Sequence, residues 1–222
     1  MAFTLLNLRK KELIEKLEKM GIRDRNVLNA IFTVKREFFV SQEFKRMAYE
    51  NNALPISNNQ TISQPYTVAI MTEQLEVFRG CSVLEIGTGS GYQAAILKEL
   101  GAEVYSVERI RELYLTAKKT LEELKYKVHL KCDDGSKGWK ERAPFDRIIV
   151  TAGSPKLPDK YIEQLKTGGK IVIPVGSKDI QQLWCVTKTE GNDKEVVIDI
   201  QKYSDFRFVP LLGEEGWTFN EE

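Results

Sequence analysis

Three glycines at alternate positions after an acidic residue are the part of this chain best suited to hold a nucleotide-like ligand. Gly87, Gly89 and Gly91 follow Glu85, which lies near the end of an apolar run. Glycine has no Cβ, so a turn of this kind brings the backbone close to a bound ligand. A dinucleotide-binding fingerprint requires Gly or Ala at position 92, where this chain has Tyr92. The spacing therefore disfavours a nicotinamide cofactor.

Two further carboxylates follow apolar segments, as expected for the ends of neighbouring strands. Glu108 follows the apolar residues 104–107, one strand–helix unit after the glycines. A carboxylate at the end of the second strand of such a unit can accept hydrogen bonds from the two ribose hydroxyls of an adenosine. Asp134 follows the next apolar segment, where it can accept from the exocyclic amine of adenine. Three consecutive strand ends thus carry groups suited to an adenosine.

The glycine spacing, with Glu85 before it, resembles the first motif of class I methyltransferases, which bind S-adenosylmethionine and release S-adenosylhomocysteine. Glu85 is expected either to stabilise the glycine turn or to reach the ammonium group of the cofactor through water. We expect no metal. The cofactor-binding residues predicted in this way are Glu85, Gly87, Thr88, Gly89, Gly91, Glu108, Asp134 and Gly135.

Alternating strand and helix patterns place these residues in an α/β fold. Strands are expected near residues 82–86, 103–107, 127–131, 146–151 and 170–175, with helices between them. This order predicts a doubly wound, mostly parallel sheet of the Rossmann-like methyltransferase type. Residues 180–202 are expected to form an antiparallel hairpin at the sheet edge, with its turn at residues 190–193.

The segment before the glycines is expected to be helical and then irregular. Apolar stripes predict one helix over residues 5–20, ending at Gly21, and a second after Asp24. Residues 41–63 are polar and expected to be irregular. A third helix is expected to begin at Ser63, the candidate N-cap, with Pro65 in its first turn.

We expect one domain over residues 1–222. Residues 1–64 form its helical extension and substrate loop, residues 65–176 its cofactor-binding core, and residues 177–222 its C-terminal strands and substrate-side segment.

Composition favours a soluble enzyme of the cytoplasm. The 222 residues carry a formal net charge of +1, which argues against binding to nucleic acid through a broad basic face. No apolar run approaches the ~20 residues that cross a membrane, and the first residues lack a signal-peptide pattern. Three cysteines without metal-binding spacing fit a reducing compartment. We expect a monomer without nucleic-acid or membrane partners, and Cys132 as a small buried hydrophobe.

A more specific pattern precedes the glycines. Residues 54–66, and above all Gln60, Thr61, Ile62 and Ser63, closely resemble the hallmark of protein-L-isoaspartate O-methyltransferases. The resemblance continues through residues 83–95, 134–135, 143–152, 165–176 and 207–211, and so covers nearly the whole chain. The chain departs from the pattern at two places: Ser57 and Asn59 replace loop glycines, and Asp133, Asp134 and Gly135 replace Gly-Asp-Gly.

The resemblance implies methylation of the α-carboxylate of L-isoaspartyl residues in damaged proteins. The ester then collapses to a succinimide, whose hydrolysis partly restores aspartate. Ser63 is implied as the active-site residue, and it can also serve as a helix cap. Thr61 either assists at the carboxylate or satisfies the loop backbone. The substrate-binding residues implied are Thr61, Ile62, Val209, Pro210 and Leu211, the last three through backbone contacts to an extended peptide.

This chemistry requires no general base, because a carboxylate is already ionised at neutral pH. His129, the only histidine, and Asp146 are therefore expected to be structural. Two alternatives stay open. An acceptor pocket closed by aromatic residues would favour a small-molecule methyltransferase. Cofactor binding without turnover of any peptide would indicate a non-catalytic binding module.

Overall fold

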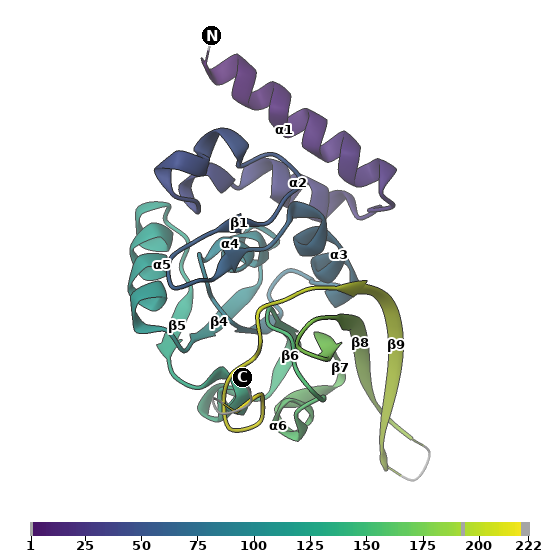
Figure 1. The fold of residues 1–222 in the computed structure, drawn as a ribbon. Helices are drawn as coiled ribbons and strands as arrows, with labels where there is room; N and C mark the ends of the chain where they lie inside the picture. The colour runs from purple at the N-terminus through teal and green to yellow at the C-terminus, as the bar shows by residue number, and fades with distance from the viewer. Residues whose placement is uncertain (1, 192–193, 219–222) are drawn as a thin grey trace.

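A seven-stranded sheet forms the centre of the molecule, with helices on both of its faces (Figure 1). The computed structural model describes residues 2–191 and 194–218. The sheet strands are β3 (Ser82–Ile86), β4 (Glu103–Glu108), β5 (His129–Cys132), β6 (Phe145–Val150), β7 (Leu165–Gly176), β8 (Gln181–Glu190) and β9 (Val196–Phe206). Their order across the sheet is β5-β4-β3-β6-β7-β8-β9.

The pairing confirms the predicted mixed sheet. All contacts from β5 through β7 are parallel, whereas β7–β8 and β8–β9 are antiparallel. The expected bounds were close for β3 and β4, but β7 begins at Leu165 and β9 continues to Phe206. The β8–β9 hairpin forms as expected. Of its predicted turn, residues 192–193 lie outside the described residues.

Alternation along each strand divides the core between the two faces of the sheet. Val83 and Ile149 pack on one face with the N-terminal helices, α3 (Pro65–Leu75), α4 (Tyr92–Glu99) and α5 (Arg111–Glu123). Leu84 and Ile148 pack on the other face, together with Tyr161 of the short helix α6 (Asp159–Glu163). Apolar residues on both faces are typical of parallel strands that are covered on both sides.

Two helices precede this core, as predicted. They are α1 (Ala2–Lys19) and α2 (Arg25–Thr33), the purple elements that lie beyond α3 and α4 in Figure 1. Asp24 caps α2, because its carboxylate accepts from the backbone N–H groups of Asn26 and Val27. No helix of the described chain is long and apolar enough to cross a membrane.

Residues 41–63 are more regular than expected. They contain a 3₁₀ helix, η2 (Gln42–Met47), and a two-stranded antiparallel sheet of β1 (Leu54–Pro55) and β2 (Thr61–Ile62). Asn58 and Asn59 have φ values of 59° and 55° and form the turn between these strands. Asparagine tolerates this left-handed backbone better than most residues, so Asn59 can replace a loop glycine. Shorter 3₁₀ helices are η1 (Arg36–Phe38), η3 (Gly135–Lys137) and η4 (Lys140–Arg142).

The start of α3 differs from the prediction. Gln64, not Ser63, occupies the cap position, and its side chain makes no cap hydrogen bond, whereas the Asn51 side chain accepts from the Tyr66 N–H in the first turn at 2.9 Å. Pro65 at the first helical position keeps the preceding Gln64 extended, so the chain turns into the helix one residue later than expected. The expected capping by Ser63 is therefore wrong.

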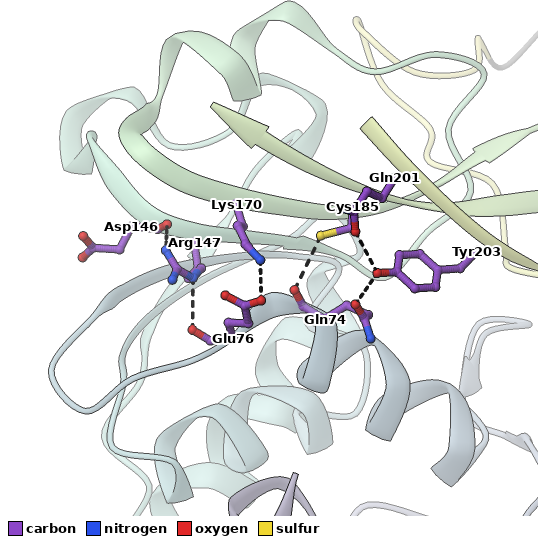
Figure 2. A network of polar contacts seen from close by, with 8 residues as sticks. All are labelled: Gln74, Glu76, Asp146, Arg147, Lys170, Cys185, Gln201 and Tyr203. Carbon is purple, nitrogen blue, oxygen red and sulfur yellow. Dashed lines mark hydrogen bonds and ion pairs between the residues drawn. The ribbon is translucent and has the colours of Figure 1, made fainter. Parts of the chain in front are cut away.

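The opposite end of α3 is tied to the sheet (Figure 2). The Tyr203 hydroxyl donates to the Gln74 side chain, and the Cys185 thiol donates to the Gln74 carbonyl at 3.6 Å. Lys170 forms an ion pair with Glu76, the C-cap residue of α3. These contacts fix the direction in which α3 presents its first turn, and with it Ser63, to the rest of the molecule.

Candidate active site

A pocket lies along the edge where the parallel strands end, and segments far apart in the sequence form its wall. This is the edge at which open α/β sheets bind ligands, because the strand order reverses beside β3. The pocket is open at its mouth and holds about 110 Å³ of space for molecules the size of water. Most of the predicted site residues line it: Thr61, Ile62, Ser63, Gly87, Thr88, Gly89, Glu108, Gly135, Val209, Pro210 and Leu211.

The glycine loop after β3 packs closely against the segment that follows β6, and its predicted approach to a ligand stays a prediction. Gly87 has φ +93°, and a Cβ there would lie 2.4 Å from Oγ1 of Thr151. Across the pocket floor, a Cβ on Gly135 would lie 2.8 Å from the Ile86 side chain. A larger residue at either position would therefore displace its neighbour in the pocket wall.

Glu108 lies at the end of β4 and is 6% exposed. One carboxylate oxygen accepts from the Gly89 N–H at 2.8 Å, and the other accepts from the Ile110 N–H at 2.8 Å. A carboxylate has about four acceptor positions, so Glu108 can support the glycine loop and still accept hydroxyl donors from the pocket. Its expected role toward a ribose stays a prediction.

Glu85 does not line the pocket and is fully buried behind it. Ser106 donates to the Glu85 carboxyl, and Oγ1 of Thr88 lies 2.6 Å from the Ser106 oxygen. Burial raises the pKa of Glu85 to about 8, the Ser106 hydrogen bond lowers it, and the nearby charge of Glu108 raises it. This chain of contacts leads from Glu85 to the glycine loop, which supports its expected role in the turn.

Gly91 and Asp134 also lie outside the pocket wall. Gly91 has φ +89° at the cap of α4, where a Cβ would lie 3.2 Å from Leu121 of α5. The Asp134 carboxylate accepts from the N–H and hydroxyl of Ser136, and from the Glu214 N–H at 2.9 Å. The expected contact between Asp134 and adenine stays a prediction. An adenine amine would have to donate to carboxylate oxygens that already accept from Ser136 and Glu214.

A second pocket adjoins the first, and Ser63 lies on the wall between them. Thr61, Ser63, Thr151 and Val209 line both pockets. The rest of the second pocket is formed by the end of β9, the start of α3 and nearby loops: Met20, Ala53, Gln64, Tyr66, Thr67, Asp205, Phe206, Arg207 and Phe208. The Ser63 side chain is in position to contact molecules held in either pocket.

The late segment Val209, Pro210 and Leu211 lines the first pocket, but its backbone is partly paired already. The Leu211 N–H donates to the Gly153 carbonyl and the Gly153 N–H donates to the Val209 carbonyl, both at 2.8 Å. The Trp217 N–H donates to the Leu211 carbonyl. The Leu211 N–H is therefore not available to a peptide, which corrects the expectation of backbone contacts along the whole segment.

Three other expectations concern residues outside both pockets. His129 lies in β5, half exposed, with its ring stacked on Tyr105. Asp146 accepts from the N–H and hydroxyl of Ser82, at the strand ends opposite the glycine loop. Both placements support structural roles. Cys132 was expected to be buried and is exposed, because β5 is the edge strand of the sheet.

Several wall residues were not predicted. Thr151 follows β6 and touches both pockets, and the rule that located Glu108, a polar residue where a strand ends, would have found it. Ile110 and Leu113 also line the first pocket. Nothing in the sequence distinguishes these apolar residues from residues of the core. In the described part of the chain, no group of three His, Cys, Asp or Glu side chains is arranged to hold a metal ion.

Comparisons with known proteins agree with this geometry. The protein from Dictyoglomus turgidum named protein-L-isoaspartate O-methyltransferase is 52% identical over 210 residues, covering 94% of this chain and 93% of that protein. A solved protein-L-isoaspartate O-methyltransferase superposes with a TM-score of 0.81 at 30% identity, covering 93% of this chain and 67% of the other.

A Plasmodium falciparum structure described as this enzyme in complex with S-adenosyl-L-homocysteine has a TM-score of 0.78. At 24% identity, with 91% of this chain and 97% of that chain covered, it supports the fold. The model of the family described as protein-L-isoaspartate(D-aspartate) O-methyltransferase matches residues 8–216. The chain therefore belongs to the protein-L-isoaspartate(D-aspartate) O-methyltransferase family.

Proposed function

We propose that this chain transfers a methyl group from S-adenosyl-L-methionine to the α-carboxylate of L-isoaspartyl residues in damaged proteins. The observation that carries the proposal is the position of Ser63 on the wall shared by two pockets. The first pocket has the glycine loop and Glu108, and the second is open to solvent. A donor and an acceptor held in these pockets would meet at Ser63.

The residues of the first pocket fit S-adenosylmethionine, which supplies an electrophilic methyl group when bound. Gly87, Gly89 and Gly135 leave space for close backbone approach, and the buried Glu108 carboxylate presents acceptors to a ribose. Thr88 links this wall to Glu85. We assign Asp134 to the adenine side, where Gly135 reaches the pocket.

Ser63 would orient the acceptor carboxylate in the second pocket. A neutral hydroxyl holds an anion with less loss of nucleophilicity than a cation would cause. No general base is needed, because the carboxylate is ionised. The structure gives Ser63 no competing cap role. Thr61 and Val209 border the same position on the shared wall.

The second pocket favours a peptide acceptor over a small molecule. Ala53, Asp205 and Arg207, all on its wall, are exposed. Tyr66 and Phe206 stack with ring centroids 6.5 Å apart and form one side without closing the pocket. Exposed residues on this wall leave room for a peptide to reach the pocket from solvent.

The broader organisation follows from the same features. We propose that residues 1–222 act as one methyltransferase domain, monomeric and cytoplasmic. Three cysteines, an odd number without metal-binding spacing, fit a reducing compartment.

Replacing Ser63 by Ala tests its role. We expect methyl transfer to an isoaspartyl peptide to fall about tenfold or more, equivalent to roughly 1.4 kcal/mol of lost orientation. Calorimetry should show nearly unchanged affinity for S-adenosylhomocysteine. Ser57→Ala is the matched control, because Ser57 is exposed in the same β1–β2 hairpin outside both pockets. Equal turnover in the two variants would remove Ser63 from catalysis.

A further inference from the structure

Arg36 is a fully buried cation beside the active-site loop. It lies in η1 and is 0% exposed. Its Nη2 donates to the Ser63 carbonyl at 2.8 Å. Within residues 2–191 and 194–218, its Nε and Nη1 have no partner with hydrogen-bond geometry. Burial lowers the pKa of Arg36, and the neighbouring Tyr92 side chain raises it. A buried charge with so few partners lowers the stability of the folded state. An apolar side chain of similar size would stabilise the core more if packing were its only role.

The contacts that Arg36 does make lead to both halves of the active site. Its guanidinium carbon lies 4.7 Å from the centroid of the Tyr92 ring. Tyr92 is the first residue of α4, directly after the glycine loop, and it lines the first pocket. Ser63, at the other end of Arg36, lies between the two pockets. The Arg36 guanidinium therefore contacts both Ser63, which borders the two pockets, and Tyr92, which lines the first pocket.

We propose that Arg36 is a positioning residue, which holds Ser63 in a fixed place relative to the start of α4. The proposal rests on the function proposed above. The planar guanidinium can donate to the Ser63 carbonyl with its edge while its face lies on the Tyr92 ring. Misplacement by about 1 Å can cost on the order of a hundredfold in rate, so the alignment of these two segments is a direct requirement of the reaction.

Lys10 provides a matched control. It is another buried cation of the N-terminal region, 7% exposed, and it donates to the Phe32 carbonyl at 3.0 Å. It also lies over the Tyr49 ring at 5.3 Å. It lines neither pocket. Lys10→Met therefore removes a buried charge with a comparable backbone contact but without a direct contact to Ser63 or Tyr92.

The test compares Arg36→Met and Arg36→Lys with Lys10→Met, all well below their melting temperatures. We expect Arg36→Met to lower kcat for an isoaspartyl peptide about tenfold or more, with S-adenosylhomocysteine affinity within about threefold of the parent. Arg36→Lys, which keeps a donor but loses the stacked plane, should recover part of this loss and remain about threefold below the parent. Lys10→Met should keep the parent kcat.

Hydrogen exchange supplies a second readout. Amides of residues 60–64 should exchange faster in both Arg36 variants than in Lys10→Met. Parent-like kcat in a folded Arg36→Met would overturn the proposal. If that variant does not fold, parent-like kcat and exchange in Arg36→Lys would overturn it. If the parent itself transfers no methyl group, the proposed function fails, whereas the exchange comparison still decides whether Arg36 holds Ser63.

Discussion

Two carboxyl groups beside the glycine loop have different surroundings and therefore different expected roles. Glu108 accepts from two backbone N–H groups at the pocket wall. Glu85 is fully buried and has one hydroxyl partner in the described chain, so burial raises its pKa to about 8. The first can serve a ligand as an acceptor, and the second serves the loop that holds the ligand.

Glu85→Gln should stabilise the protein increasingly as the pH rises. The folded-state pKa of about 8 exceeds the ordinary value of 4.5, so the folded state holds an extra proton between these values. The contribution of Glu85 to the free energy of unfolding is fully present below pKa 4.5. It is lost as the pH rises through the folded-state pKa of about 8. Glutamine removes this loss. We expect its advantage over the parent to grow from pH ~5 and to reach roughly 2–5 kcal/mol above pH ~8.

Chemical denaturation of both proteins at several pH values measures this difference. An advantage that does not change with pH would show that Glu85 does not titrate in this window.

Sequence located most residue types with a chemical signal at the pocket wall, whereas their roles toward a ligand stay predictions. Carboxylates and glycines where strands end, such as Glu108 and Gly87, have few other reasons to occupy such positions. Ile110 and Leu113 could not be predicted, because apolar helix residues that face a ligand have the same pattern as those that face a core. Asp134 was expected to contact adenine, but it lies outside the pocket wall and its carboxylate accepts from the C-terminal segment, so that role stays a prediction.

At the scale of elements, the glycine loop can be tested with an internal control. Gly87→Ala introduces a Cβ 2.4 Å from Thr151 Oγ1 at φ +93°. Gly80 has φ +83° but nothing within 4 Å of an added Cβ. Both substitutions should lower stability by roughly 1–2 kcal/mol through left-handed backbone strain. Only Gly87→Ala should also lower S-adenosylhomocysteine affinity, by about tenfold or more, measured by calorimetry.

Similar affinities in these two variants would mean that the close approach at Gly87 does not shape the ligand site.

The elements that sequence predicted best were those with long apolar patterns. β3, β4 and the first two helices follow such patterns. The β1–β2 sheet was missed because each strand has two residues, too few for a periodic signal, and its turn uses left-handed Asn58 and Asn59. The cap of α3 was missed by one residue because the helix starts at Pro65. This difference supports Ser63 as a residue of the site instead of the helix.

For the whole molecule, the proposed reaction depends on two pockets that share a wall of four residues, Ser63 among them. The sheet edge provides the first pocket, and the end of β9 with the start of α3 provides the second. α3 is anchored to the sheet through Gln74 and Glu76 (Figure 2). The meeting of these pockets could not be predicted from sequence, because it depends on how β9 and α3 pack across the fold.

The position of the only histidine relative to the two pockets determines how methyl transfer is expected to depend on pH. His129 lies in β5, outside both pockets, and the nucleophile is a carboxylate with an ordinary pKa near ~4. Methyl transfer should therefore rise with substrate ionisation and stay flat from pH ~5.5 to ~7.5. A steep dependence near pH ~6.5 that is lost in His129→Gln would instead identify a catalytic base.

Methyl transfer to two peptides that differ only in an L-isoaspartyl or an L-aspartyl linkage tests the central claim most directly. The isoaspartyl linkage adds a methylene to the backbone and exposes a free α-carboxylate. A site that fixes the flanking backbone can aim only one of these carboxylates, and misplacement by about 1 Å costs on the order of a hundredfold in rate. We predict rapid transfer to the isoaspartyl peptide and little or none to its partner. Equal rates for the two peptides would contradict the account.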